Sequence, residues 1–130
     1  MDLKKSLSSY RELIVWQKAI ELVTEVYSVT RGFPREETYG LTAQMRRCAV
    51  SVPSNIAEGQ GRATRGEFIL FLSHARGSLF ELETQLIIAG KLDYLNLEMT
   101  QQVHAKLTEV ARILNGLLTS LDVSTRKPRR

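Results

Sequence analysis

Apolar residues recur every three or four positions in four long blocks of this chain, which is the spacing of helices that each bury one face. The blocks cover residues 13–29, 36–61, 64–90 and 96–121. No stretch alternates between apolar and polar residues in the manner of a strand. Because the connections are short, neighbouring helices should run antiparallel, and the pattern predicts an all-α, up-down-up-down four-helix bundle. One domain over residues 1–125 should be followed by a tail at 126–130.

The first block is apolar over more of its circumference than a small bundle requires. Two neighbouring lines of apolar residues run along it. They consist of Leu13, Trp16, Ile20, Val23 and Tyr27, and of Val15, Ala19, Leu22, Val26 and Val29. Together they cover about 200° of the helix, whereas a helix within one bundle typically needs an apolar stripe of little more than 100°. The extra width predicts contact with a second partner, such as another subunit.

Residues typical of helix ends lie between the blocks. In chain order they are Gly32, Pro34, the pair Thr64 and Glu67, Gly90 and Asn96. Gly32 should close the first helix in a left-handed turn, Gly90 should close the third, and Pro34 should precede the second. Thr64 and Glu67 have the spacing of a capping box, and Asn96 is a good N-cap for the fourth helix.

The second block carries Pro53 in its interior and a line of polar residues along one side. The proline removes a backbone donor, so a kink is expected near residues 49–53. The polar line, called the polar seam below, consists of Arg47, Ser51, Ser54, Asn55, Glu58 and Arg62. Buried polar groups cost stability unless they are hydrogen-bonded, so a structural network at the bundle centre or between subunits is the favoured interpretation. The alternative is that Arg47, Arg62 and Arg65 present positive charge to phosphate.

The net charge of +4 is unevenly distributed along the chain. Arg126, Lys127, Arg129 and Arg130 give the tail four basic residues and no acid, which leaves a neutral body. Within the body, residues 46–76 contain five arginines against two glutamates, and residues 81–122 contain three basic against six acidic residues. A basic tail either binds polyanions through phosphate contacts or serves only solubility, and both interpretations stay open.

No group of residues has the spacing of a catalytic or metal site. His74 and His104 fall in different blocks without a partner at ligand spacing, so no metal site is expected. Ser51 and Ser54 have no adjacent histidine to activate them. Cys48 lies in an apolar seam, which is typical of a small core residue. We therefore predict no enzyme activity and no cofactor.

Two further features have a functional and a structural interpretation. Gly59 and Gly61 precede basic residues and a helix start, an arrangement that can hold an anion. Without a preceding strand or a Gly-Lys-Ser/Thr sequence, a capped turn is favoured over a nucleotide loop. Trp16 and Tyr27 occupy core spacing, with base stacking as the alternative role.

The chain shows no sign of a membrane or secretory destination. No apolar run approaches the roughly 20 residues of a membrane span, and the N-terminus lacks the apolar core of a signal peptide. A single cysteine, Cys48, excludes an internal disulfide, which fits a cytoplasmic location.

Four stretches of the sequence resemble a bacterial four-helix-bundle family, the 23S rRNA-intervening-sequence proteins. They are LIVWQKA at 13–19, FPREETYGL at 33–41, QMRRCAVSVPSNIAEGQGR at 44–62 and FLSHARGSLFELET at 71–84. The resemblance covers roughly residues 12–121, and the basic tail lies outside it.

The resemblance implies a left-handed up-and-down bundle that assembles as a homopentameric ring with a central opening. Reading frames of this family lie inside intervening sequences of ribosomal RNA genes, or resemble frames that do, and a nucleic-acid role is presumed for them. The fold is also similar to the accessory proteins of diversity-generating retroelements, which form pentamers and bind a reverse transcriptase and nucleic acid.

The sequence and the resemblance together predict a non-enzymatic, ring-forming binding protein with RNA or DNA as its partner. Eight basic residues are expected to contact phosphates: Arg46, Arg47, Arg62, Arg65, Arg126, Lys127, Arg129 and Arg130. The alternative is a protein-interaction adaptor, such as an accessory subunit of a reverse transcriptase, in which the basic surface serves a protein partner.

Overall fold

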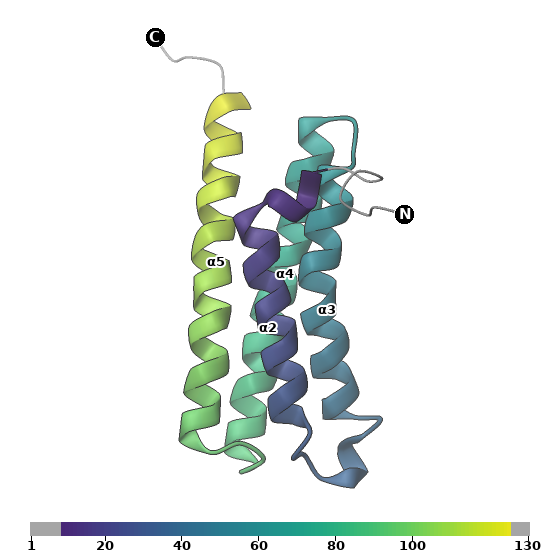
Figure 1. The fold of residues 1–130 in the computed structure, drawn as a ribbon, viewed down its shortest axis with the longest axis vertical. Helices are drawn as coiled ribbons and strands as arrows, with labels where there is room; N and C mark the ends of the chain where they lie inside the picture. The colour runs from purple at the N-terminus through teal and green to yellow at the C-terminus, as the bar shows by residue number, and fades with distance from the viewer. Residues whose placement is uncertain (1–8, 126–130) are drawn as a thin grey trace.

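A computed structural model describes residues 9–125, and within this range the chain is helical, without strands. Its elements are η1 (Ser9–Glu12), α2 (Ile14–Thr30), η2 (Arg35–Glu37), α3 (Leu41–Gln60), α4 (Arg65–Lys91) and α5 (Leu97–Thr125). The four α-helices form a bundle, as the spacing of apolar residues predicts (Figure 1). The predicted tail at 126–130 lies outside the described residues.

Each long helix packs against two neighbours. Helix α2 packs against α3 and α5, and α4 packs against the same two helices. In Figure 1 the α2–α3 and α4–α5 connections lie at the lower end of the bundle and the α3–α4 connection at the upper end. The buried side chains from all four helices form one apolar core.

The two apolar lines of α2 have different surroundings. The second line, from Val15 to Val29, is almost completely buried in the core. In the first line, Ile20 and Tyr27 are 37% and 39% exposed, and Trp16 is half-buried. One chain therefore covers only part of the apolar width of this helix, as its sequence pattern indicates.

The predicted N-caps of α4 and α5 are confirmed. The backbone N–H of Glu67 donates to Oγ1 of Thr64 at 3.1 Å, and the N–H of Met99 donates to Oδ1 of Asn96 at 2.8 Å. Each bond satisfies a first-turn donor that the helix itself leaves without an acceptor.

The predicted roles of two glycines in helix ends are wrong. No glycine among residues 9–125 has a positive φ, so Gly32 does not form a left-handed turn. Instead, the N–H of Phe33 donates to the Thr30 carbonyl at 3.1 Å, and this turn directs the Phe33 ring into the core. Gly90 lies inside α4, and Asp93 takes the left-handed position with φ 62°.

The bonds after α4 explain why the left-handed residue is Asp93. The N–H of Tyr94 donates to the Ala89 carbonyl at 3.0 Å, and that of Asp93 donates to the Gly90 carbonyl at 3.1 Å. These are the two bonds of a Schellman motif, and aspartate tolerates the left-handed conformation better than most residues. The turn also brings the ring of Tyr94 against Phe33, with 5.4 Å between the ring centroids.

Helix α3 begins later than the sequence predicts, whereas its end at Gln60 agrees with the predicted end at Gly59 or Gly61. A helix is expected from residue 36, whereas η2 and a turn precede the actual start at Leu41. Oε1 of Glu37 accepts the Leu41 N–H at 3.0 Å and so satisfies the first turn of a helix that starts there. At the other end Gly59 is inside the helix, where a Cβ would lie 2.8 Å from that of Phe71. The absence of a side chain at Gly59 therefore lets α3 and α4 approach closely. Helix α3 continues through Pro53 without ending there.

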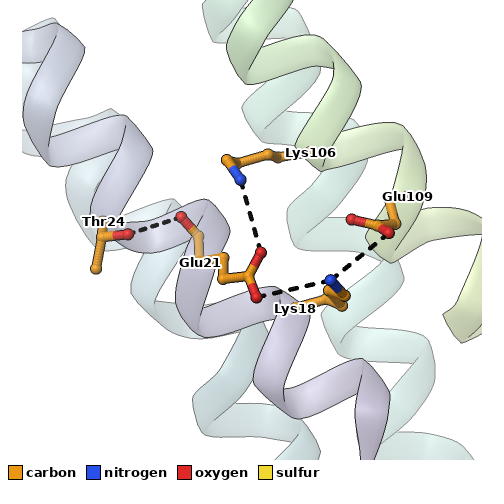
Figure 2. A network of polar contacts seen from close by, with 5 residues as sticks. All are labelled: Lys18, Glu21, Thr24, Lys106 and Glu109. Atoms are coloured by element: carbon orange, nitrogen blue, oxygen red, sulfur yellow. Dashed lines mark hydrogen bonds and ion pairs between the residues drawn. The ribbon is translucent and has the colours of Figure 1, made fainter.

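Charged residues join α2 to α5 across the surface (Figure 2). Lys18 lies 3.7 Å from Glu21 and 3.8 Å from Glu109, and Lys106 lies 3.6 Å from Glu21. These side chains are a third to a half exposed, so each pair contributes about 0–1 kcal/mol. The opposite charges compensate one another here, which makes this face a poor polyanion site.

Candidate nucleic-acid interface

The polar seam lies on the outer face of α3 and not at the centre of the bundle. Arg47, Ser54 and Glu58 are exposed, whereas Ser51 and Asn55 are half-buried at the edge nearest α4. The bundle centre is therefore excluded as its location. The opposite side of α3, with Met45, Val52 and Ile56, faces the core, and the seam is directed away from it. A position between subunits or at a ligand remains a prediction.

The half-buried edge of the seam is hydrogen-bonded to α4. Oγ of Ser51 lies 2.7 Å from Oγ of Ser78 and also bonds the Cys48 carbonyl at 2.6 Å. Nδ2 of Asn55 donates to the Ser51 carbonyl at 2.8 Å. The Ser51–Ser78 contact joins α3 to α4, whereas the other two bonds lie within α3. The exposed members of the seam are left for other contacts.

Cys48 is a buried thiol beside this network. Its Sγ lies 3.0 Å from the Ser78 carbonyl, and its side chain is almost inaccessible to solvent. Burial, followed by the nearby carboxylate of Glu81, raises the pKa of this thiol to about 12. Since the thiolate is the nucleophile, this environment suits a structural cysteine.

Arg46 is held within the fold. Its Nε donates to Oγ1 of Thr30 at 2.9 Å, and its Nη2 donates to the Tyr27 carbonyl at 3.3 Å. The guanidinium carbon lies 4.6 Å from the centroid of the Tyr27 ring, over its face. Arg46 thus joins α3 to α2, with its position fixed by three contacts.

Arg62 and Arg65 lie at the other end of α3, on both sides of the α3–α4 connection. Arg62 is 2.6 Å from Oε2 of Glu58 and stacks over Phe71 at 4.7 Å. Arg65 is the first residue of α4 and is exposed. The Glu58 carboxylate offsets part of the positive charge at this end.

Arg47 differs from these arginines. Its side chain is exposed, and none of residues 9–125 forms a hydrogen bond or ion pair with its guanidinium. It precedes Arg62 by 15 residues, which corresponds to roughly 22 Å along a helix. Arg46 and Arg47 therefore lie on α3, whereas Arg62 and Arg65 lie beyond its other end, so the four predicted arginines do not form one patch. The four predicted tail residues lie outside the described part of the chain.

A groove runs between α2 and α3 on the same side of the molecule. Its upper part is mainly apolar and is lined by Tyr10, Trp16, Ile20, Val23, Val50, Pro53, Ser54 and Ala57. Its lower part differs in that it contains two arginines, and it is lined by Tyr27, Thr38, Tyr39, Thr42, Ala43, Arg46, Arg47, Val50 and Ser51. Tyr27 is on the surface of this groove, so the prediction that it is a core residue is wrong: its neighbour Val26 takes the buried position.

Sequence reasoning missed Tyr39 and the outer face of α4. Tyr39 is 95% exposed in the turn before α3. The sequence contains one indication of this exposure, because Tyr39 is an aromatic residue outside the helical spacing, eight positions before Arg47. On α4, four apolar side chains lie outside the regular line of buried residues and are 43–63% exposed: Leu70, Phe80, Ile87 and Ile88. These four side chains make up the α4 patch, and an exposed apolar patch is typical of a contact surface.

The described residues contain no cluster suited to a metal ion. No three His, Cys, Asp or Glu side chains of residues 9–125 come together at one point. His104 lies 3.1 Å from Glu83 across α4 and α5, and His74 contacts the ring of Phe71. None of the helices in this range is both long and apolar enough for a transmembrane span.

Comparison with known proteins agrees with this architecture. A crystal structure of a protein of unknown function from the S23 ribosomal protein family of Bacteroides thetaiotaomicron has the same fold, with a TM-score of 0.75. That protein is 20% identical to this one, and the match covers 82% of this chain and 96% of the other. No curated protein matches the sequence. The model of the 23S rRNA-intervening sequence proteins matches residues 11–116, and the chain therefore belongs to this family.

Proposed function

We propose that this protein is a non-enzymatic, ring-forming binding protein that contacts RNA or DNA phosphates. The observation that carries the proposal is Arg47, an exposed cation without a partner among residues 9–125, on the outer face of α3. Arg62, Arg65 and the basic tail would extend the contact. Such contacts position a nucleic acid without reading its sequence.

The assembly in this proposal is a homopentamer of up-down-up-down bundles. A ring needs two different surfaces on each subunit, because contacts in a ring run head to tail. The chain offers two such surfaces. One is the apolar upper groove around Ile20, and the other is the α4 patch around Phe80. Covering both would remove exposed apolar area from water.

Because the same site is repeated on every subunit of a ring, weak contacts at each copy would be sufficient for nucleic-acid binding. Five copies place five Arg47 side chains on one particle, and binding of one raises the effective concentration of the others. The proposal needs no catalytic group, and the burial and raised pKa of Cys48 fit a structural thiol. A cytoplasmic location fits a lone, reduced cysteine.

The experiment is a salt titration with a fluorescein-labelled single-stranded oligonucleotide, followed by anisotropy. The logarithm of affinity should fall linearly with the logarithm of salt concentration. Arg47→Gln should reduce the slope by about 0.7 for each engaged copy, and deletion of residues 126–130 should reduce it further. Arg112→Gln is the matched control, because Arg112 is also exposed but lies on α5. Affinity that does not respond to salt would refute the proposal.

The second candidate is an adaptor that binds a protein such as a reverse transcriptase. The observation that favours it is the α4 patch, where Phe80 is 63% exposed and apolar. Aromatic side chains are enriched in protein–protein interfaces. Contacts to phosphates are made mainly by charged and polar groups instead. Co-purification of a reverse transcriptase, lost in Phe80→Asp but retained in Arg47→Gln, would support this function over the first.

A further inference from the structure

The lower part of the α2–α3 groove has the composition of a ligand site. Its volume is about 690 Å³, within the range of pockets that hold small organic groups. Ala43 and Val50 supply apolar surface, and Tyr27 and Tyr39 supply two aromatic rings. Two of its nine lining residues are arginines and none is acidic, so this lower part of the groove, the hollow, is positively charged.

No contact within the described residues explains why position 39 carries an aromatic side chain. It is 95% exposed, and none of residues 9–125 forms a hydrogen bond with its hydroxyl. Tyr94 shows the contrast, since it packs on Phe33 and bonds Glu37. An aromatic face that contributes nothing to its own core is available to stack on another planar group.

The two arginines of the hollow have different roles. Arg46 is fixed by Thr30 and Tyr27, so its charge has a defined place at the wall. Arg47 is unpaired within the described residues and can move to meet an anion. A planar ring beside a mobile cation matches the two parts of a nucleotide, its base and its phosphate.

We propose that this hollow holds one unpaired nucleotide of single-stranded RNA or DNA, with the base against Tyr39 and a phosphate at Arg47. The inference rests on the proposed function and specifies its ligand. Bases of a duplex are already stacked on one another, so the site favours single strands. From Arg47, the remainder of the strand would follow the outer face of α3 towards Arg62.

The test uses a 12-nucleotide oligouridine and its deoxyuridine counterpart, both fluorescein-labelled, and a labelled duplex of equal length. Tyr39→Ala should weaken binding of the single strands by about ten-fold, whereas binding of the duplex should not change. Tyr39→Phe retains the ring and should bind as the unmodified protein does. A 5-iodouracil version should photo-crosslink to the peptide that contains Tyr39. Because Tyr39 is exposed, thermal unfolding of Tyr39→Ala should match that of the unmodified protein.

Three results would overturn the inference. Salt-dependent binding that Tyr39→Ala leaves unchanged, with crosslinks elsewhere, would remove the nucleotide site but leave the proposed function standing. A smaller assembly mass for Tyr39→Ala would assign the hollow to a contact between copies. Absence of any salt-dependent binding would remove the proposed function itself. If the first tests succeed, tighter binding of oligouridine than of its deoxy counterpart identifies RNA as the ligand of the hollow, and the reverse identifies DNA.

Discussion

The hydroxyl of Tyr94 donates a 2.9 Å hydrogen bond to Oε2 of Glu37, a residue 57 positions earlier in the chain. The other oxygen of the same carboxylate accepts the Leu41 N–H. One side chain therefore caps α3 and also joins the α2–α3 connection to the α4–α5 connection, which lie at the same end of the bundle in Figure 1. Glu37 couples the start of one helix to the turn between two others.

This arrangement predicts a specific acid sensitivity. The bond from the Leu41 backbone, then that from Tyr94, lowers the pKa of Glu37 below its usual value. A lowered native pKa contributes stability above the unfolded pKa of about 4.3, and that stability is lost as pH falls through the native pKa. Urea unfolding of Glu37→Gln should therefore depend less on pH between 5 and 3 than unfolding of the unmodified protein. Glu98→Gln, at an exposed site, is the control, and equal pH dependence in all three would contradict the assignment.

Two glycines should respond in opposite directions to alanine. A Cβ on Gly59 would lie 2.8 Å from Cβ of Phe71 and 3.1 Å from the Phe68 ring, so Gly59→Ala must separate α3 from α4. We expect a loss of about 1–3 kcal/mol in the free energy of unfolding. Gly77 in α4 has nothing within 4 Å of that position, so Gly77→Ala should gain about 0.5–1 kcal/mol from helix propensity. Urea midpoints of the two variants measure both effects, and equal shifts would refute the close approach at Gly59.

The helices were predictable because each depends on a repeating signal. The apolar spacing identifies all four, and Thr64 and Asn96 are N-caps because their side chains act within three residues. The start of α3 was not predictable in this way. It depends on Glu37, whose second bond comes from Tyr94, and such a contact between distant positions leaves no local pattern.

The candidate site was predictable in its residue types but not in its geometry. The sequence places Arg46 and Arg47 side by side, yet Arg46 folds onto Tyr27 while Arg47 is exposed. Arg46 is the one that contacts α2, through Thr30 and Tyr27, and this depends on the packing of the two helices. Tyr39 lies outside every helical repeat, so its exposure follows only from the turn that the structure places before α3.

Cys48 should be almost unreactive in the folded protein. With a pKa of about 12, its thiolate fraction near pH 8 is roughly 10³-fold below that of an ordinary thiol, and modification by a disulfide reagent should slow at least accordingly. A raised thiol pKa contributes stability that is complete below the unfolded pKa of about 8.5 and is lost as pH rises towards 12. Denatured protein is the positive control, and a folded-state rate close to the denatured rate would contradict the burial of Cys48.

Gln85 should be replaceable by an apolar side chain without loss. It is 6% exposed, and its Oε1 has no hydrogen-bond partner among the described residues. A buried acceptor without a partner costs about 1–3 kcal/mol, so Gln85→Met should raise the free energy of unfolding by up to that amount. Gln101→Met, on the surface of α5, should change it little. Destabilisation by Gln85→Met would indicate that Oε1 has a partner, such as a bound water.

The proposed ring makes a prediction about mixtures of variants. Ile20→Asp would damage the groove and leave the α4 patch intact, whereas Phe80→Asp would do the reverse. If the two surfaces join head to tail, each variant alone cannot form the contact and should be a monomer. Mixed together, they retain one intact groove and one intact patch, so they should form a one-to-one dimer that cannot grow further. Native mass spectrometry distinguishes these species, with Glu98→Gln as a control that should assemble fully. A mixture that stays monomeric although the unmodified protein assembles would exclude this pairing of surfaces, since each variant supplies what the other lacks.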